Sequence, residues 1–335
     1  MTAVDQAFDQ FDTSLNLALG ERTKAELRHN YVRDVLEAAG IIVGSFLQGS
    51  FARKTMLKPL KDVDIVCLLP ETKRSDFTGP GGAARALESF KEPIGSKWPT
   101  AKFDSGEEPA GKALRVEFDD VDFTIDLVAA FEVPGDTEDV IIADREADEW
   151  VVAKSRTLNR LIRERNQECG GRFIHQVRMA KTLKHTHEDL DHFKGIVIES
   201  VAYEAVKTSM THQEALAAIV KAAADLLRGP LMDPTGEGDV TAKWSYAERQ
   251  RAVEKLGELS QRAEEALSLE AGGDEHGAQD VWGSVLGEDF PKPPARTPAE
   301  VLGTWHVGST TSTGRPSSSD AGRHSPAPTR PWRSM

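Results

Sequence analysis

The sequence predicts an α/β protein of two lobes, and three observations support this. Short apolar runs that could form buried strands are confined to residues 1–150, whereas residues 151–290 show long helical patterns. Beyond them, the composition changes to Pro, Ser, Thr, Gly and Arg. We therefore expect a twisted mixed sheet with flanking helices in residues 1–150, a helical lobe that completes a cleft in residues 151–290, and a disordered tail in residues 291–335.

The composition is that of a soluble globular protein. With 335 residues, of which 39% are hydrophobic and 28% charged, the chain can bury a core. A formal net charge of −13 argues against stable nucleic-acid binding, although nucleotides remain possible ligands. The chain lacks an apolar run of membrane-spanning length and a signal-peptide pattern, so we expect no membrane association and a cytoplasmic location. Cys67 and Cys169 are expected to be reduced and structural.

Residues 4–39 are predicted to form one long helix at the start of the first lobe. Leu27, Tyr31 and Val35 would lie on one stripe, and Gly40 would end the helix. This helix is expected to pack across the sheet.

The next apolar run, Ile41 to Leu47, ends at Gly49-Ser50. A glycine there lets backbone N–H groups approach an anion closely, and the serine hydroxyl adds a donor. Most Gly-Ser pairs are plain turns, so this pair is informative only together with the Asp-x-Asp motif that begins at Asp62.

Asp62 and Asp64 lead into the apolar run Ile65 to Leu69, which is predicted to be a buried strand. Residues i and i+2 of a strand face the same side and lie roughly 6.7 Å apart. At that distance two carboxylates repel by about 2.5 kcal/mol at an effective dielectric constant of 20, a cost that a divalent cation would reverse. The pair is predicted to bind metal.

A third carboxylate comes from a predicted hairpin whose second strand carries Asp126. Leu114, Val116 and Phe118 form one apolar face before a turn at Asp119-Asp120. Asp122 shares the face of Asp126 but lies about 13 Å away, near the turn, and is assigned to solvent. Three carboxylates suit a pair of metal ions about 3.5 to 4 Å apart. An edge carboxylate without catalytic function is the alternative for Asp126.

With these motifs in place, the sequence resembles the DNA polymerase β-type nucleotidyltransferases, in which Gly-Ser, Asp-x-Asp and a later Asp recur. It is more similar to the cGAS/DncV-like nucleotidyltransferases of bacterial anti-phage signalling. The segments GSFARKTMLKPLKDVDIVCLL, FTIDLVAAFE, MDPTGEGDV and VWGSVLGEDF, within about residues 5 to 290, carry this resemblance.

The resemblance implies a polymerase β-like fold and synthesis of a cyclic di- or oligonucleotide from nucleoside triphosphates, with release of pyrophosphate. It implies two Mg²⁺ or Mn²⁺ ions on Asp62, Asp64 and Asp126, and a separate effector protein that responds to the product. Gly49 and Ser50 would orient the β and γ phosphates.

The helical half supplies candidate cations for the triphosphate. Arg178, Lys181 and Lys184 make the helix after Gly171 basic, and Lys181 and Lys184 share a side. The resemblance implies that a lysine here binds the donor triphosphate, for which we choose Lys181. A solvated basic face is the alternative. Members of the resembled family usually have a serine near the position of Gly195, and this sequence lacks it there.

Other groups of polar residues in this half have simpler interpretations. His185, His187 and His192 lie close together in sequence, but without cysteines they are weak zinc candidates. Asp233 and Asp239 in the loop LMDPTGEGDV are expected to form turns, and Ser245 with Glu248 is expected to open a helix as a capping box.

Two other functions stay open on the sequence alone. One is a nucleotidyltransferase that modifies a different acceptor, such as an RNA end, a protein or a small molecule. The other is a non-catalytic nucleotide-binding module, which the three aspartates disfavour.

Overall fold

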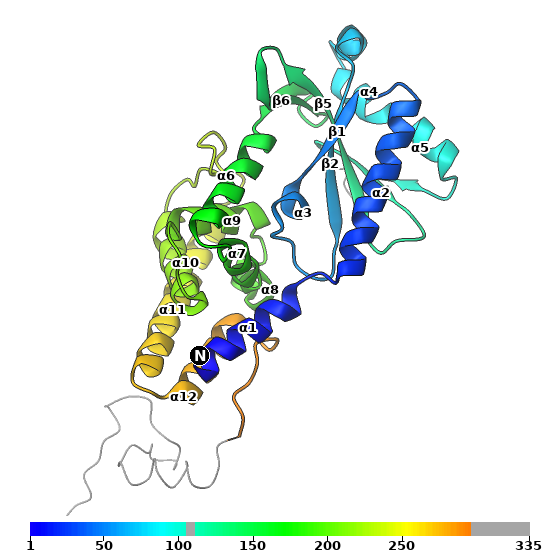
Figure 1. Ribbon diagram of the computed structural model, residues 1–335. Helices are drawn as coiled ribbons and strands as arrows, with labels where there is room; N and C mark the ends of the chain where they lie inside the picture. Colours follow the sequence, from blue (N-terminus) through cyan, green and yellow to red (C-terminus); the bar gives the residue numbers. More distant parts are fainter. Residues whose placement is uncertain (105–110, 296–335) are drawn as a thin grey trace, which may run out of the picture.

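The computed structural model describes residues 1–104 and 111–295, and β5 is the central strand of its seven-stranded sheet (Figure 1). Residues 296–335, most of the segment expected to be a disordered tail, lie outside the described residues. The strands are β1 (Gly44–Gln48), β2 (Asp62–Leu68), β3 (Lys102–Phe103), β4 (Leu114–Glu117), β5 (Thr124–Val133), β6 (Asp136–Asp144) and β7 (Glu149–Ala153).

The sheet is mixed, as the sequence predicts. Its order is β1-β2-β5-β4-β3, and β6 pairs with the far end of β5 and with β7. Strands β2 and β5 are parallel, and the other pairs are antiparallel. The predicted hairpin is present as β4 and β5, but its connection is longer than a turn at Asp119-Asp120, because β4 ends at Glu117 and β5 begins at Thr124. Asp122 is exposed in this connection, as expected.

The two faces of the sheet have different surroundings. One face packs against α2 (Leu19–Ala38), α4 (Gly82–Glu88) and α5 (Lys91–Lys97) through a core that contains Ile65 and Leu127. A 3₁₀ helix, η1 (Glu71–Phe77), precedes α4. On the other face, Val66 and Val128 belong to a smaller apolar cluster. The residue alternation of a strand places Asp62, Asp64 and Asp126 on this second face.

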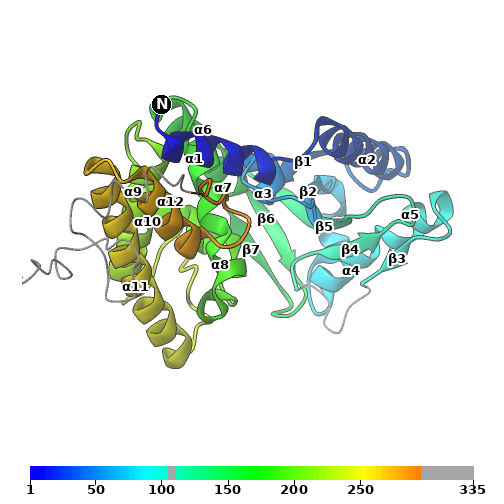
Figure 2. The ribbon, with the colours of Figure 1, turned by 90° about the horizontal axis from the view of Figure 1, so that it is seen from below.

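The long N-terminal helix expected over residues 4–39 is two helices. Helix α1 (Ala3–Leu15) ends where Asn16 adopts an extended conformation, and α2 begins after Ala18, which is also extended. The two helices separate because α1 buries Phe8 and Phe11 in the core of the helical lobe, whereas α2 lies on the sheet. Figure 2 shows them following one another along one edge of the molecule.

The predicted stripe of α2 is also wrong. Leu27 and Tyr31 are 48% and 57% exposed, and the buried side is formed instead by Ala25, Arg28, Val32 and Leu36. The apolar pattern does not predict this buried side, because Arg28 is charged and does not count as an apolar position. Its guanidinium lies over the Phe118 ring and pairs with Asp120, so the residue packs like an apolar one.

The helical lobe is built around one core that includes Trp282, Phe173 and Phe290. Its helices are α6 (Ser155–Glu168), α7 (Phe173–Lys181), α8 (Leu183–Thr186), η2 (Glu188–Leu190), α9 (Gly195–Ala205), α10 (His212–Leu226), α11 (Tyr246–Ala271) and α12 (Glu275–Leu286). The capping box of Ser245 and Glu248 opens α11, as predicted.

The loop carboxylates and the cysteines lie in the surroundings that the sequence predicts. The carboxylates of Asp233 and Asp239 accept hydrogen bonds from the backbone N–H groups of nearby turn residues, which confirms them as turn formers. Cys67 and Cys169 are buried free thiols, as expected. Within the described ranges, no helix combines the length and apolarity needed to cross a membrane.

Candidate active site

Asp64 and Asp126 lie directly opposite each other on the parallel strands β2 and β5. Asp62, two residues before Asp64, is paired in the same register with Thr124. Val63 between the two β2 aspartates is fully buried in the opposite core, so both aspartates point to the second face of the sheet. The three carboxylates predicted from the sequence therefore belong to one face and two adjacent strands.

The three carboxylates influence one another electrostatically. Burial, together with the negative charges of Asp62 and Asp126, raises the pKa of Asp64 to about 7. Burial and the charge of Asp126 likewise raise the pKa of Asp62. Concentrated, partly desolvated negative charge of this kind favours a divalent cation.

Gly49 brings the backbone of the Gly-Ser segment against Asp64. It begins the short helix α3 (Gly49–Arg53) with φ of +70°, in the left-handed region. A Cβ atom built on Gly49 would lie 1.8 Å from the Asp64 Oδ2 atom. A side chain at this position would therefore collide with the carboxylate, in addition to the backbone strain.

Beside these residues lies a cavity of about 920 Å³, lined by Ser50 and Asp62 from the sheet lobe and by Lys184 and Gly195 from the helical lobe. The segment Gly287–Asp289, which follows α12, also lines it. Its volume lies at the upper end of the range typical of ligand sites. The hydroxyl of Ser50 has no hydrogen-bond partner within residues 1–104 and 111–295, so it is available as a donor.

A buried charge cluster joins the two lobes at the edge of this cavity. The Glu199 carboxylate from α9 accepts hydrogen bonds from Arg53 Nε at 2.7 Å, Lys181 Nζ at 2.6 Å and the Thr55 hydroxyl at 2.5 Å. Burial alone would raise the pKa of Glu199, but Arg53, Lys181 and Thr55 hold it at about 2. Two cations and one carboxylate leave the cluster with a net positive charge.

The two predicted triphosphate-binding lysines have different surroundings. Lys181 is 4% exposed, and its ammonium donates to Glu199 and to the carbonyl and hydroxyl oxygens of Thr55. Lys184 also lines the cavity, and its ammonium forms no hydrogen bond or ion pair with the part of the chain that the structure describes. Burial and the charge of Lys61 lower the pKa of Lys184. Lys61, which is exposed on the same cavity, adds a further cation.

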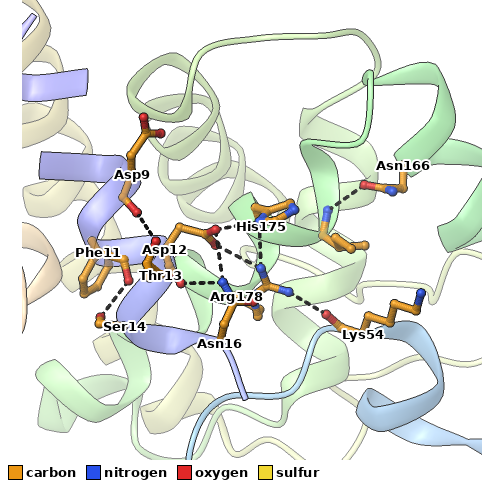
Figure 3. A network of polar contacts seen from close by, with 11 residues as sticks. Asp9, Phe11, Asp12, Thr13, Ser14, Asn16, Lys54, Asn166, His175 and Arg178 are labelled. Carbon is orange, nitrogen blue, oxygen red and sulfur yellow. Dashed lines mark hydrogen bonds and ion pairs between the residues drawn. The ribbon is translucent and has the colours of Figure 1, made fainter. Parts of the chain in front are cut away.

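A second polar network ties α1 to the segment after α3 (Figure 3). Asp12 on α1 accepts from Arg178 Nη2 at 3.0 Å and contacts His175 Nδ1 at 2.7 Å. Arg178 also donates from Nη1 to the Lys54 carbonyl oxygen at 3.1 Å. Consecutive residues from Arg53 to Thr55 are thus each held by a charged side chain of the helical lobe.

Arg115 on β4 is a site residue that the sequence analysis missed. It lies opposite Asp126 in the antiparallel register of β4 and β5. Its Nε and Nη2 atoms donate to Asp126 Oδ1 and Oδ2, both at 2.9 Å. A tight turn at Asp119-Asp120 would place Arg115 opposite Thr124. The observed register pairs Glu117 with Thr124 and so sets Arg115 opposite Asp126, which the sequence pattern does not indicate.

Glu199 was missed for a different reason. It lies in the apolar sequence GIVIES, where a single carboxylate gives no pattern. Its partners Arg53 and Thr55 are about 145 residues earlier in the chain, and only the docking of the two lobes brings them together.

The donor chemistry of the three aspartates fits a pair of divalent cations. In the described part of the chain, however, no three His, Cys, Asp or Glu side chains are gathered closely enough to hold an ion together. Both oxygens of Asp126 accept hydrogen bonds from Arg115. Among the zinc candidates, His187 Nε2 contacts the Val285 carbonyl oxygen, and the His192 ring packs against Trp244.

Comparison with known proteins identifies related sequences and folds. Residues 1–166 match the family model described as the Second Messenger Oligonucleotide or Dinucleotide Synthetase domain, SMODS. Among curated proteins no match was found.

Solved structures resemble the whole two-lobed fold. Escherichia coli MS115-1 CdnC, solved with ATP, is 14% identical with a TM-score of 0.67, over 85% of this chain and 98% of CdnC. Vibrio cholerae DncV, a cyclic AMP-GMP synthase, is 15% identical with a TM-score of 0.66, over 87% and 98% of the two chains. Bradyrhizobium diazoefficiens CdnG, solved with GTP, is 15% identical with a TM-score of 0.65, over 85% and 96%.

Proposed function

The chain belongs to the cGAS/DncV-like nucleotidyltransferases, the family of second messenger oligonucleotide and dinucleotide synthetases, and on this premise we propose how its site works. The protein joins ribonucleoside triphosphates into a cyclic di- or oligonucleotide and releases pyrophosphate. The observation that carries this proposal is the placement of Asp62, Asp64 and Asp126 on one sheet face, beside Gly49 and a cavity shared by both lobes.

Asp62, Asp64 and Asp126 would hold two Mg²⁺ or Mn²⁺ ions. When bound, such ions lower the pKa of an attacking ribose hydroxyl and neutralise charge on the phosphates. The raised pKa of Asp64 reflects its burial and the crowding of these carboxylates, both of which a bound cation would offset. The role of the chain is to keep these donors together in a partly desolvated place.

The triphosphate would lie along the Gly-Ser segment. The backbone of Gly49 and the available Ser50 hydroxyl offer donors to its oxygens. We assign the direct lysine contact to Lys184, assisted by Lys61, because these ammonium groups line the cavity and form no hydrogen bond or ion pair with the described residues, although the charge of Asp62 acts on Lys184. Lys181 directs its donors to Glu199 and Thr55, so it would contribute chiefly through the positive charge of the buried cluster.

The setting that fits this reaction is bacterial anti-phage signalling, in which the product activates a separate effector protein. The relatives solved with ATP and GTP support nucleotides as substrates. A cavity of about 920 Å³ lined by both lobes has room for a nucleotide.

The proposal is tested by replacing Asp62 and Asp64 singly with Asn and measuring pyrophosphate release from the four ribonucleoside triphosphates. Loss of a metal ligand should lower the rate at least about 10³-fold, since metal ions supply several kcal/mol of transition-state stabilisation. Asp122→Asn, an exposed change near the start of β5, is the matched control and should keep near-full activity.

Thermal unfolding should show that the Asn variants are folded. Asp64→Asn should be at least as stable as the wild type, because it removes a buried negative charge beside two others. Folded Asn variants with activity within tenfold of the wild type would overturn the assignment of these aspartates.

A further inference from the structure

The carboxylate of Asp126 is fully engaged by Arg115. The two parallel N–H···O bonds, both 2.9 Å long, use both carboxylate oxygens, and Asp126 itself is only 7% exposed. Two parallel bonds of this kind are the strong and geometrically specific form of an Arg–carboxylate pair. Any cation that binds Asp126 must therefore compete with a guanidinium.

We propose that Arg115 is a counter-ion of the metal site when no metal ion is bound. Its hydrogen bonds to the Asp126 oxygens break when a divalent cation binds there. The inference rests on the proposed metal site. Arg115 acts through Asp126 and is a positioning residue, because it sets how readily that carboxylate becomes a ligand.

The charge around Arg115 supports this role. Asp62, Asp64 and Asp126 bring three carboxylates to one sheet face, and Arg115 directly contacts one of them. Its charge also acts on Asp62 and Asp64. Without a metal ion, Arg115 compensates part of this negative charge; with metal ions present, its positive charge opposes them.

The backbone of Arg115 is fixed, whereas its side chain has room to move. Asp104 Oδ1 accepts from the Arg115 backbone N–H at 3.2 Å, and the Arg115 carbonyl oxygen accepts from the Asp104 N–H at 2.9 Å. Arg145 in turn holds both oxygens of Asp104 at 3.0 Å. The Arg115 side chain is 38% exposed, so the guanidinium can leave Asp126 without a change in the sheet.

The test is the affinity for Mn²⁺, measured by electron paramagnetic resonance of the free ion without nucleotide. Arg115→Gln should bind Mn²⁺ at least tenfold more tightly than the wild type, because it removes both a competitor and a positive charge. Arg115→Lys, which keeps the charge but cannot form two parallel bonds, should be intermediate. This second variant also preserves the test if Arg115→Gln fails to fold.

Arg156→Gln is the matched control. Arg156 also binds a β5 carboxylate, Glu132, with two bonds of 2.9 Å, but six residues from Asp126. Its Mn²⁺ affinity should equal that of the wild type. An unchanged or weaker affinity in both Arg115 variants would overturn the inference.

The result separates this inference from the proposed function. Asp64→Asn should lose the measured Mn²⁺ binding if the ion occupies the proposed site. Wild-type protein without such binding, or binding that survives in Asp64→Asn, would contradict the metal site itself, and with it the role of Arg115. Binding that depends on Asp64 but not on Arg115 would contradict only the counter-ion role.

Discussion

Gly49 sets the distance between the backbone of the Gly-Ser segment and the Asp64 carboxylate. Its positive φ and the Asp64 carboxylate, 1.8 Å from where a Cβ would be, leave room only for hydrogen. The backbone of the Gly-Ser segment, which we propose binds phosphate, can therefore lie against Asp64, a proposed metal ligand. Any larger residue must displace Asp64, the α3 segment or both.

Gly49→Ala should consequently lower the rate of nucleotide transfer by at least about 10²-fold, because a shift of about 1 Å in a reacting group can have that effect. Steady-state pyrophosphate release measures it. Gly40→Ala is the matched control, since Gly40 also has a positive φ, +66°, but no atom within 4 Å of its Cβ position. Gly40→Ala should be less stable but active, and an active Gly49→Ala would contradict the tight contact.

Some of the site could be predicted from the sequence because its residues are related by local rules. Asp62 and Asp64 share a face through the strand period of two, and Gly49 precedes them along the same pair of strands. Arg115 and Glu199 follow no local rule, since their roles depend on strand register and on lobe docking. The sequence also placed Lys181 at the cavity but could not indicate that Glu199 would engage its ammonium group.

At the scale of elements, α1 is the least expected feature. The apolar pattern continues from α1 into α2, so it predicts one helix, yet three residues in extended or irregular conformation separate the two. Helical propensity could not reveal which core each half would join. Asp12 then anchors α1 to α7 through His175 and Arg178 (Figure 3).

Asp12 makes this anchor dependent on pH. Burial would raise the pKa of Asp12, but its hydrogen bond with His175 and the charge of Arg178 lower it from 3.8 to about 2. A carboxylate with a lowered pKa in the folded state stabilises the fold above its ordinary pKa. That stabilisation is lost as the pH falls from about 4 through 2.

Asp12→Asn should therefore lower the free energy of unfolding near pH 7 by about 1–3 kcal/mol, the usual cost of removing a hydrogen bond to a charged group. The difference from the wild type should shrink as the pH approaches 2. Urea unfolding at a series of pH values measures both effects. Asp9→Asn, on the exposed side of the same helix, should show neither, and a constant difference for Asp12→Asn would contradict the ionic anchor.

At the scale of the whole molecule, the two lobes have separate cores but share one short segment. Arg53, Lys54 and Thr55 lie three to five residues after Ser50, and Glu199, Arg178 and Lys181 of the helical lobe hold them. The position of the Gly-Ser backbone, our proposed phosphate site, therefore depends on how the helical lobe sits. This arrangement gives the helical lobe a direct influence on the residues that we propose to be catalytic.

The distribution of charge is also a property of the whole chain. The net charge of −13 would repel nucleotides, yet the cavity collects Lys61, Lys184 and the positively charged cluster around Glu199. Local cations of this kind can attract a triphosphate to an acidic protein. The choice of bases and the linkage between them depend on contacts in this cavity that no sequence pattern indicates.

Synthesis of a cyclic nucleotide is tested by identifying the product. Purified protein is incubated with all four labelled ribonucleoside triphosphates and Mg²⁺ or Mn²⁺, treated with phosphatase and analysed by mass spectrometry. We expect a phosphatase-resistant cyclic di- or oligonucleotide that is missing with Asp64→Asn. Labelled nucleotide found only on an RNA end, a protein or a small molecule supplied as acceptor, without a cyclic product, would show that the protein is a transferase of another kind.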